Sequence, residues 1–214
     1  MCFNLEVSLT TFVLGVFGSI LLIKYGNSKY KKENTIFAYL AIFAILMQLV
    51  DAGIWYDLDN KIGLNTAMTY FGSFIVYLQP TFLYLLKIAF NNNKISLTSP
   101  ENGPLAIANF IYLVYFIGYY KYFTANNKMV TSLHPTTKHL QWKWVSYAQP
   151  YAYLIMLAIN FFYLTDYKYS FYGLMILYTL LVLSRVFFRY NTGEIWCFFG
   201  ALMPFGFLAL SYMI

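Results

Sequence analysis

The sequence has little charge, cysteine and histidine for its length. Only 10% of its 214 residues are Asp, Glu, Lys or Arg, whereas a water-soluble domain carries about 25%. Its two cysteines cannot form a disulfide framework, and together with its two histidines they are too scattered to predict a four-ligand zinc site. These absences exclude an ordinary soluble domain, and we expect neither a metal nor another cofactor.

Apolar and aromatic side chains take the place of the missing charge. Hydrophobic residues make up 60% of the chain and aromatic residues 22%, and the mean hydropathy is +0.57. This composition excludes disorder and predicts an integral membrane protein, whose main partner is the lipid bilayer. A net charge of +6 would suggest a nucleic-acid partner for a soluble protein. Here the basic residues lie mainly between apolar segments, as orientation signals do, so we expect no nucleic acid.

Seven apolar stretches are long enough to cross a bilayer, which requires roughly 20 residues. Polar connectors separate them, and the longest covers residues 124–143. Almost no sequence remains for a soluble domain, so we expect a single all-α domain, a bundle of seven transmembrane helices. The predicted spans are 8–23, 36–56, 64–90, 104–123, 144–164, 170–188 and 195–214.

The first connector predicts the orientation of the chain. No basic residue precedes the first span, whereas Lys24, Lys29, Lys31 and Lys32 follow it closely. Because basic loops stay on the cytoplasmic side, we expect this connector to be cytoplasmic and the N-terminus exoplasmic. The first span also lacks a small-residue cleavage site, so it is interpreted as a retained helix and not as a signal peptide.

Polar side chains inside the predicted spans are costly in lipid, and they therefore mark candidate sites. Gln48, Asp51 and Trp55 recur at three and four residues in the second span, which places them on one face of a helix. Threading the seven spans brings further polar groups into the same half of the membrane. The candidate polar cavity, on the side of the N-terminus, consists of Gln48, Asp51, Trp55, Gln79, Gln149, Arg185 and Glu194.

These residues also have a purely structural interpretation. Asp51 could extend to the interface, make one helix-packing hydrogen bond, or pair with Arg185. Pro80 and Pro150 would kink helices and free carbonyl groups for a cavity, but kinks also occur in packed membrane helices. Trp55 and the other tryptophans fit an aromatic belt at the interface equally well. The sequence leaves both interpretations open.

Several functional classes lack the residues that they need. A retinal protein of the usual seven-helix plan requires a lysine in its last helix, and residues 195–214 contain none. A zinc-dependent membrane hydrolase needs three histidines, whereas His134 and His139 are alone and lie in the long connector. Nucleophile signatures, phosphate loops and arginine ladders are absent as well. We therefore do not expect an enzyme, which would depend on Asp51 or Glu194 without a metal.

Short motifs spread over most of the chain resemble those of one family. They are Phe3-Asn4 followed by Ser8, Tyr25-Gly26-Asn27, Met47-Gln48 with Asp51 and Trp55, Leu78-Gln79-Pro80, and Trp196-Cys197-Phe198. With them the chain resembles an uncharacterised multi-pass membrane protein family of large DNA viruses of protists and some microbes. The family pattern favours Glu at the position of Asp51, so this chain keeps the acid with a shorter reach. The resemblance implies a host or virion membrane and supplies no known activity.

Two functions remain open on these residues. The first is a transporter, channel or receptor-like protein, in which the cavity takes a small molecule or a cation and Asp51 is a proton or cation site. The second is a structural protein of a viral or host membrane, in which the same residues only join helices. Replacing Asp51 with Asn separates them, because the first function predicts lost activity at normal abundance and the second predicts tolerance.

Overall fold

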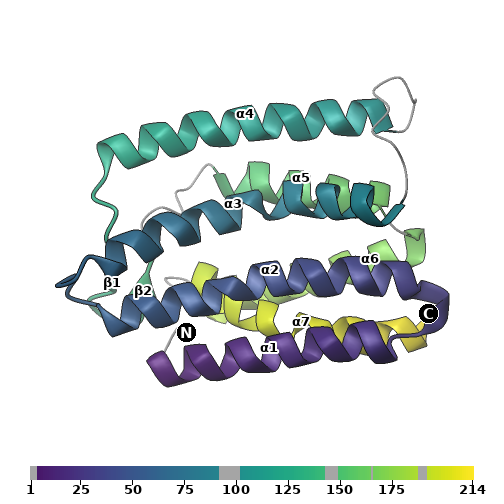
Figure 1. The fold of residues 1–214 in the computed structure, drawn as a ribbon, viewed down its shortest axis with the longest axis horizontal. Coiled ribbons are helices and arrows are strands. Elements are labelled where there is room, and N and C mark those ends of the chain that lie inside the picture. The colour runs from purple at the N-terminus through teal and green to yellow at the C-terminus, as the bar shows by residue number, and fades with distance from the viewer. Residues whose placement is uncertain (1–3, 92–101, 143–148, 165, 188–191) are drawn as a thin grey trace.

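The computed structural model describes residues 4–91, 102–142, 149–164, 166–187 and 192–214, and within these the chain is helical, as expected. Its seven α-helices are α1 (Leu5–Tyr25), α2 (Lys31–Tyr56), α3 (Leu64–Asn91), α4 (Asn102–Asn126), α5 (Gln149–Leu164), α6 (Tyr167–Phe187) and α7 (Thr192–Met213) (Figure 1). Short polar side chains define where helices start: Asn4 Oδ1 accepts a hydrogen bond from the Val7 N–H at α1, and Asp166 Oδ1 accepts one from the Tyr169 N–H at α6.

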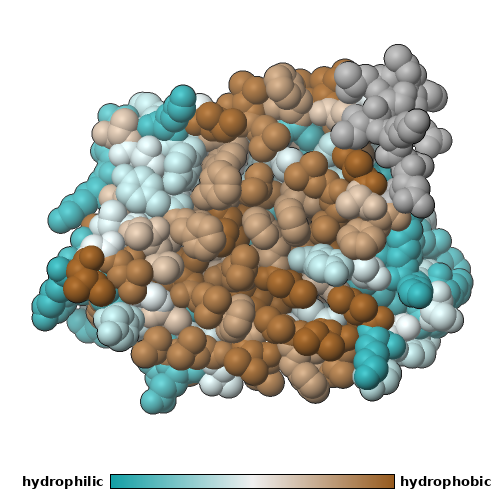
Figure 2. All heavy atoms as spheres, viewed as in Figure 1, coloured by the Kyte–Doolittle hydropathy of each residue, from teal (hydrophilic) through white to brown (hydrophobic). Residues whose placement is uncertain are grey.

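Five of these helices, α1, α2, α3, α4 and α6, are long and apolar enough to cross a membrane, judged by length and composition. The apolar parts of the other two are shorter, Tyr151–Tyr163 in α5 and Phe198–Met213 in α7. The 16 residues of α5 extend over about 24 Å, against roughly 30 Å for a typical hydrocarbon core. Residues 144–148, which belong to the predicted fifth span, lie outside the described residues. The face of the molecule seen in Figure 2 has a broad apolar band between two hydrophilic ends, as a membrane protein requires.

Helix α2 is the most buried of the five long helices and packs against α1, α3 and α7. Helix α3 contacts α2 on one side and α4 and α5 on the other, while α6 joins α5 to α7. Helix α4 lies at the edge of the bundle, where it packs mainly against α3 and α5 (Figure 1). The two termini lie at opposite ends of the bundle, as an odd number of antiparallel helices requires (Figure 1).

Helix α1 approaches its neighbours closely through two glycines. A Cβ atom at Gly15 would lie 2.5 Å from Ile45 Cδ1 of α2 and 3.0 Å from the Ala201 carbonyl oxygen of α7. A Cβ atom at Gly18 would lie 2.7 Å from the Phe205 ring of α7. Small residues therefore allow three helices to meet, which is the usual means of close packing in lipid.

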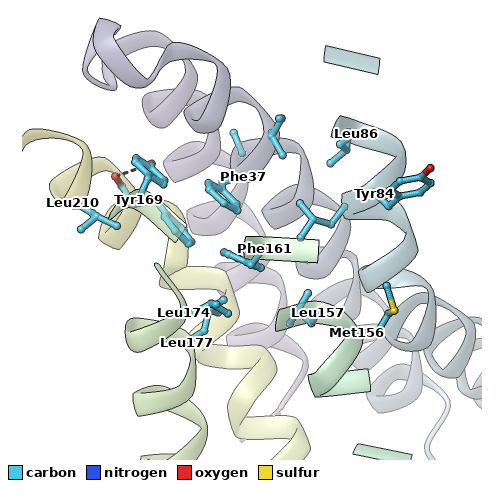
Figure 3. Packing of buried hydrophobic residues seen from close by; sticks show 14 of the residues in the cluster. Phe37, Tyr84, Leu86, Met156, Leu157, Phe161, Tyr169, Leu174, Leu177 and Leu210 are labelled. Carbon is cyan, nitrogen blue, oxygen red and sulfur yellow. Dashed lines mark hydrogen bonds between the residues drawn. The ribbon is translucent and has the colours of Figure 1, made fainter. Parts of the chain in front are cut away.

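A stacked aromatic core joins four helices. The ring of Phe37 in α2 lies 4.6 Å from that of Phe207 in α7, 4.8 Å from that of Phe161 in α5 and 5.4 Å from that of Tyr169 in α6. Phe37, Phe161 and Tyr169 converge on this core in Figure 3. The buried Tyr169 hydroxyl donates a hydrogen bond of 2.6 Å to Asn34 Oδ1, so the one polar group of the core is satisfied.

The connector between α4 and α5 contains a small hairpin, which the all-α prediction did not include. Strands β1 (Ser132–Leu133) and β2 (Leu140–Gln141) pair in antiparallel register. Thr131, the residue just before β1, is bonded to the side-chain amide of Asn65 at the start of α3. Asn65 Nδ2 donates to the Thr131 carbonyl oxygen at 2.8 Å, and the Thr131 N–H donates to Asn65 Oδ1 at 3.0 Å. The connector is thereby folded against the end of the bundle near the N-terminus (Figure 1).

Candidate functional site

Asp51 lies in α2 with no exposure to solvent. The indole Nε1 of Trp142, which follows the hairpin, donates a hydrogen bond of 3.2 Å to Asp51 Oδ1. Trp142 is itself buried, in an apolar cluster with Met47 and Val50 of the same helix, and Trp55 packs at its margin. A buried carboxyl group needs such a donor, because an unpaired one is costly in a low-dielectric environment. The connector therefore supplies a partner for the acid from 91 residues away.

Gln48, one turn before Asp51, is bonded to a different helix. The Thr11 hydroxyl of α1 donates to Gln48 Oε1 at 2.8 Å, and both side chains are buried. The amide Nε2 of Gln48 is buried without a hydrogen-bond partner in the part of the chain that the structure describes. Gln48 and Asp51 thus share one face of α2, as predicted, but their polar atoms bond to separate neighbours.

Gln79 lines a small, partly open cavity between the helices of the bundle. The Tyr153 hydroxyl of α5 donates a hydrogen bond of 2.6 Å to Gln79 Oε1. The cavity contains about 40 Å³ of space, enough for about three water molecules at 10–15 Å³ each. Its lining residues come from five helices and are almost all apolar: Phe37, Leu40, Ala41, Ala44, Gln79, Tyr153, Leu157, Phe161, Leu177, Gly200, Met203 and Phe207.

Gly200 of α7 lines this cavity, and the absence of a side chain there leaves free space. The residue is buried, yet a Cβ atom built there would meet, among the described residues and apart from its own stretch of helix, no atom within 4 Å. Beside it, the Gln79 amide has used one of its two polar atoms on Tyr153. Either assignment of the amide oxygen and nitrogen leaves one hydrogen-bonding atom for a molecule in the cavity.

A second polar cluster, which the sequence analysis missed, joins α3, α4 and α5. Asn109 and Asn160 are buried and exchange two hydrogen bonds, each 3.0 Å from Nδ2 to Oδ1. Asn160 Nδ2 also donates to the Pro80 carbonyl oxygen at 2.8 Å, and Asn109 Nδ2 donates to the Leu105 carbonyl oxygen at 2.9 Å. The rule that selected Gln79, a polar side chain at membrane depth, would have selected both asparagines.

Lys87 of α3 was also missed, because the sequence analysis treated the lysines as residues of the connectors. It is buried, and its ammonium group donates a hydrogen bond of 2.6 Å to the Tyr163 carbonyl oxygen. That carbonyl belongs to the last turn of α5, where the helix leaves acceptors unpaired and the dipole favours a cation. Lys87 therefore caps a neighbouring helix.

Asp57 ends α2 and fixes the start of α3. Its carboxylate accepts hydrogen bonds from the backbone N–H groups of Lys61 at 2.7 Å and Leu64 at 2.8 Å, and longer ones from Ile62 and Asn65 at 3.3 Å. Desolvation raises the pKa of this carboxyl group. The four backbone donors together lower the pKa by a larger amount, so it lies below its ordinary value. Asp57 thereby holds the turn onto which the hairpin folds.

The predicted cavity residues fall into separate surroundings. Gln79 lines the central cavity, whereas Asp51 lies about 10 Å further along α2 than Ala44, another residue of the cavity wall. Arg185 is exposed in the last turn of α6. The backbones of Gln149 and Glu194 belong to α5 and α7, but their side chains lie outside the described part of the chain.

Among the described residues, no group of three or more His, Cys, Asp and Glu side chains is placed to hold a metal ion. Comparison with protein-family models, curated proteins and solved structures finds no match for this chain.

Proposed function

We propose that this chain is a multi-pass integral membrane protein that binds a small molecule inside its helix bundle, as a carrier or a receptor does. In this proposal all seven helices cross the bilayer. Five have the necessary length and apolar composition, and the opposite positions of the termini support an odd number of crossings (Figure 1). The short helix α5 spans a bilayer that thins around it, at a cost of fractions of a kcal/mol per Å of mismatch.

The central cavity carries this proposal. Apolar walls with one converging polar group are the lining that small-molecule sites usually have. Here Phe37, Phe161 and Phe207 provide apolar walls, and the amide of Gln79 provides the polar group. Because the cavity contains only about 40 Å³ of space, the ligand class that fits is a molecule of very few atoms, mainly apolar and with one hydrogen-bonding group, such as a two-carbon alcohol. Met203, a flexible side chain in the wall, provides room for adjustment around a larger molecule.

The test compares cavity-filling variants in lipid nanodiscs. Gly200→Leu places a side chain into the free space of the cavity, whereas Gly206→Leu adds the same side chain to the same helix, also into open space, away from the cavity. Binding of ethanol, whose three non-hydrogen atoms match the space of the cavity, is measured by saturation-transfer NMR, with empty nanodiscs as the background. We expect saturable binding to the natural protein and to Gly206→Leu, and at least tenfold weaker binding to Gly200→Leu.

A second variant keeps the test decisive if Gly200→Leu does not fold. Gln79→Leu removes the polar group and is expected to weaken binding of ethanol while leaving binding of xenon, an apolar probe, intact. Failure of the natural protein to bind either probe above the nanodisc background would refute the proposed function. So would equal binding of ethanol to the natural protein, Gly200→Leu and Gln79→Leu.

A structural role in a viral or host membrane is the second candidate. It is favoured by the pairs that bond one helix or connector to another, Thr11 with Gln48, Trp142 with Asp51, and Asn109 with Asn160. This role predicts that variants at these pairs change abundance and stability while no small molecule binds in the cavity. The same NMR experiment therefore separates the two candidates.

A further inference from the structure

The end of the bundle that carries the α1–α2 turn has a cluster of exposed lysines. Four of them fall within residues 24–32, and a fifth lies at the start of α6. The rings of Tyr30 and Tyr169 lie 5.2 Å apart and join the turn to the start of α6. Among the described residues beside these lysines, Glu33 and Asp166 are the acids. We define the basic platform as Lys24, Lys29, Lys31, Lys32 and Lys168.

Hydrogen bonds to other helices hold the backbone of this turn in place. The Asn27 N–H donates to Ser211 Oγ of α7 at 3.1 Å, and Asn34 Nδ2 of α2 donates to the Asn27 carbonyl oxygen at 3.1 Å. The Tyr212 hydroxyl donates to the Tyr25 carbonyl oxygen at 2.5 Å. The lysines therefore project from a fixed support, so little backbone entropy is lost when a ligand binds them.

The same lysines lie beside tyrosine rings and at the margin of the apolar spans. Lys24 Nζ lies 5.3 Å from the ring centroid of Tyr25, and Lys29 Nζ lies 4.6 Å from that of Tyr30. Tyrosine and lysine side chains are amphipathic, and at the ends of membrane helices they lie at headgroup depth. The apolar parts of α1 and α2 adjoin this level directly.

We propose that the basic platform binds the phosphate groups of anionic phospholipids in the leaflet around it. The proposal depends on the membrane insertion put forward above but not on small-molecule binding. Several lysines beside an apolar band attract anionic headgroups, and the attraction falls with ionic strength. Lipid is favoured over a soluble acidic partner because a lipid can satisfy the lysines and the adjoining apolar surface together. The platform then faces the anionic cytoplasmic leaflet, in agreement with an exoplasmic N-terminus.

The test measures which lipids stay with the full-length protein. The protein is extracted from bilayers of phosphatidylcholine and phosphatidylserine in equal parts, and the retained lipids are counted by native mass spectrometry. Two triple variants are compared. The platform variant carries Lys29→Gln, Lys31→Gln and Lys32→Gln. The control variant carries Lys121→Gln, Lys128→Gln and Lys138→Gln, at three exposed lysines of the opposite end of the bundle. We expect several-fold enrichment of phosphatidylserine in the natural protein, loss of at least half of it in the platform variant, and little change in the control variant.

Four further measurements keep the result interpretable. Replacing the same three platform lysines with Arg retains the charge and is expected to retain the enrichment of phosphatidylserine. This variant gives a result even where the Gln variant folds poorly. Raised salt is expected to lower the enrichment of phosphatidylserine. An equal loss in the two Gln triples, no enrichment in the natural protein, or displacement of the lipid by inorganic phosphate would overturn the proposal. Binding of ethanol by the platform variants is expected to be unchanged, which separates this proposal from the one about the cavity.

Discussion

Replacing Asn160 with Leu tests whether polar pairs at membrane depth hold α3, α4 and α5 together. Asn160 is fully buried. It donates hydrogen bonds to the Pro80 carbonyl oxygen and to Asn109 Oδ1, and it accepts one from Asn109 Nδ2. Leu has a similar size, so the substitution removes three hydrogen bonds and opens little space.

The expected loss follows from these three bonds. Interhelical hydrogen bonds in membrane proteins contribute about 0.6 kcal/mol each on average, because the unfolded chain in the membrane also finds partners. Three such bonds give about 2 kcal/mol. Asn109 retains its bond to the Leu105 carbonyl oxygen, so its amide is not left wholly unpaired. We therefore expect the free energy of unfolding to fall by about 2 kcal/mol, and not by the larger amounts seen when a buried group loses every partner.

The assay is reversible unfolding in mixed micelles, followed by circular dichroism. Asn126→Leu is the matched control, because Asn126 is exposed and bonds only within its own helix, to the Tyr122 carbonyl oxygen, as far as the structure describes it. Surface changes of this kind alter stability by about 0.5 kcal/mol or less. The double variant Asn109→Leu with Asn160→Leu is expected to lose clearly less than the sum of the single variants, since they share two bonds. A loss at Asn160 no greater than that at Asn126 would refute the reasoning.

Two further predictions concern Asp51 in α2 and Asp57, which follows the last residue of α2. Asp51→Asn keeps an oxygen acceptor for the indole of Trp142, so the thermal midpoint of this variant should stay near that of the natural protein. Asp51→Leu removes the acceptor of this buried hydrogen bond and should lower the thermal midpoint clearly. Equal losses would show that the acid itself is required. The lowered pKa of Asp57 contributes stability above about pH 4 that is lost as the pH falls through the folded value. Thermal midpoints should therefore fall more steeply in acid for the natural protein than for Asp57→Asn, and parallel curves would contradict this.

The helices were accessible to sequence analysis because lipid imposes a strong and local rule. Apolar runs broken by polar connectors predicted the span 36–56 within the observed α2 (Lys31–Tyr56) and the span 64–90 almost coincident with α3 (Leu64–Asn91). The start of α2 was predicted late because its first turn is charged and polar, and only the apolar part was counted. Helical periodicity likewise placed Gln48 and Asp51 on one face of α2.

The partners of the polar side chains were not accessible in the same way. Nothing local to Asp51 indicates that its donor is Trp142, because the pairing depends on a connector that folds back over the bundle. That fold depends on the amide of Asn65, which holds Thr131 from 66 residues away. Such contacts are set by tertiary packing, which neither composition nor periodicity encodes, and the same is true of the pairing of Asn109 with Asn160 across two helices.

The buried amides differ in what remains free after packing, and this difference indicates where a ligand can bind. Asn160 has both of its polar atoms engaged by neighbouring helices, so a ligand would have to break existing bonds. Gln79 has one polar atom engaged by Tyr153 and lies in the wall of a cavity. Gln48 also has an unpaired atom, but it does not line that cavity. A free hydrogen-bonding atom is useful to a ligand only where there is also space beside it, and Gln79 combines the two.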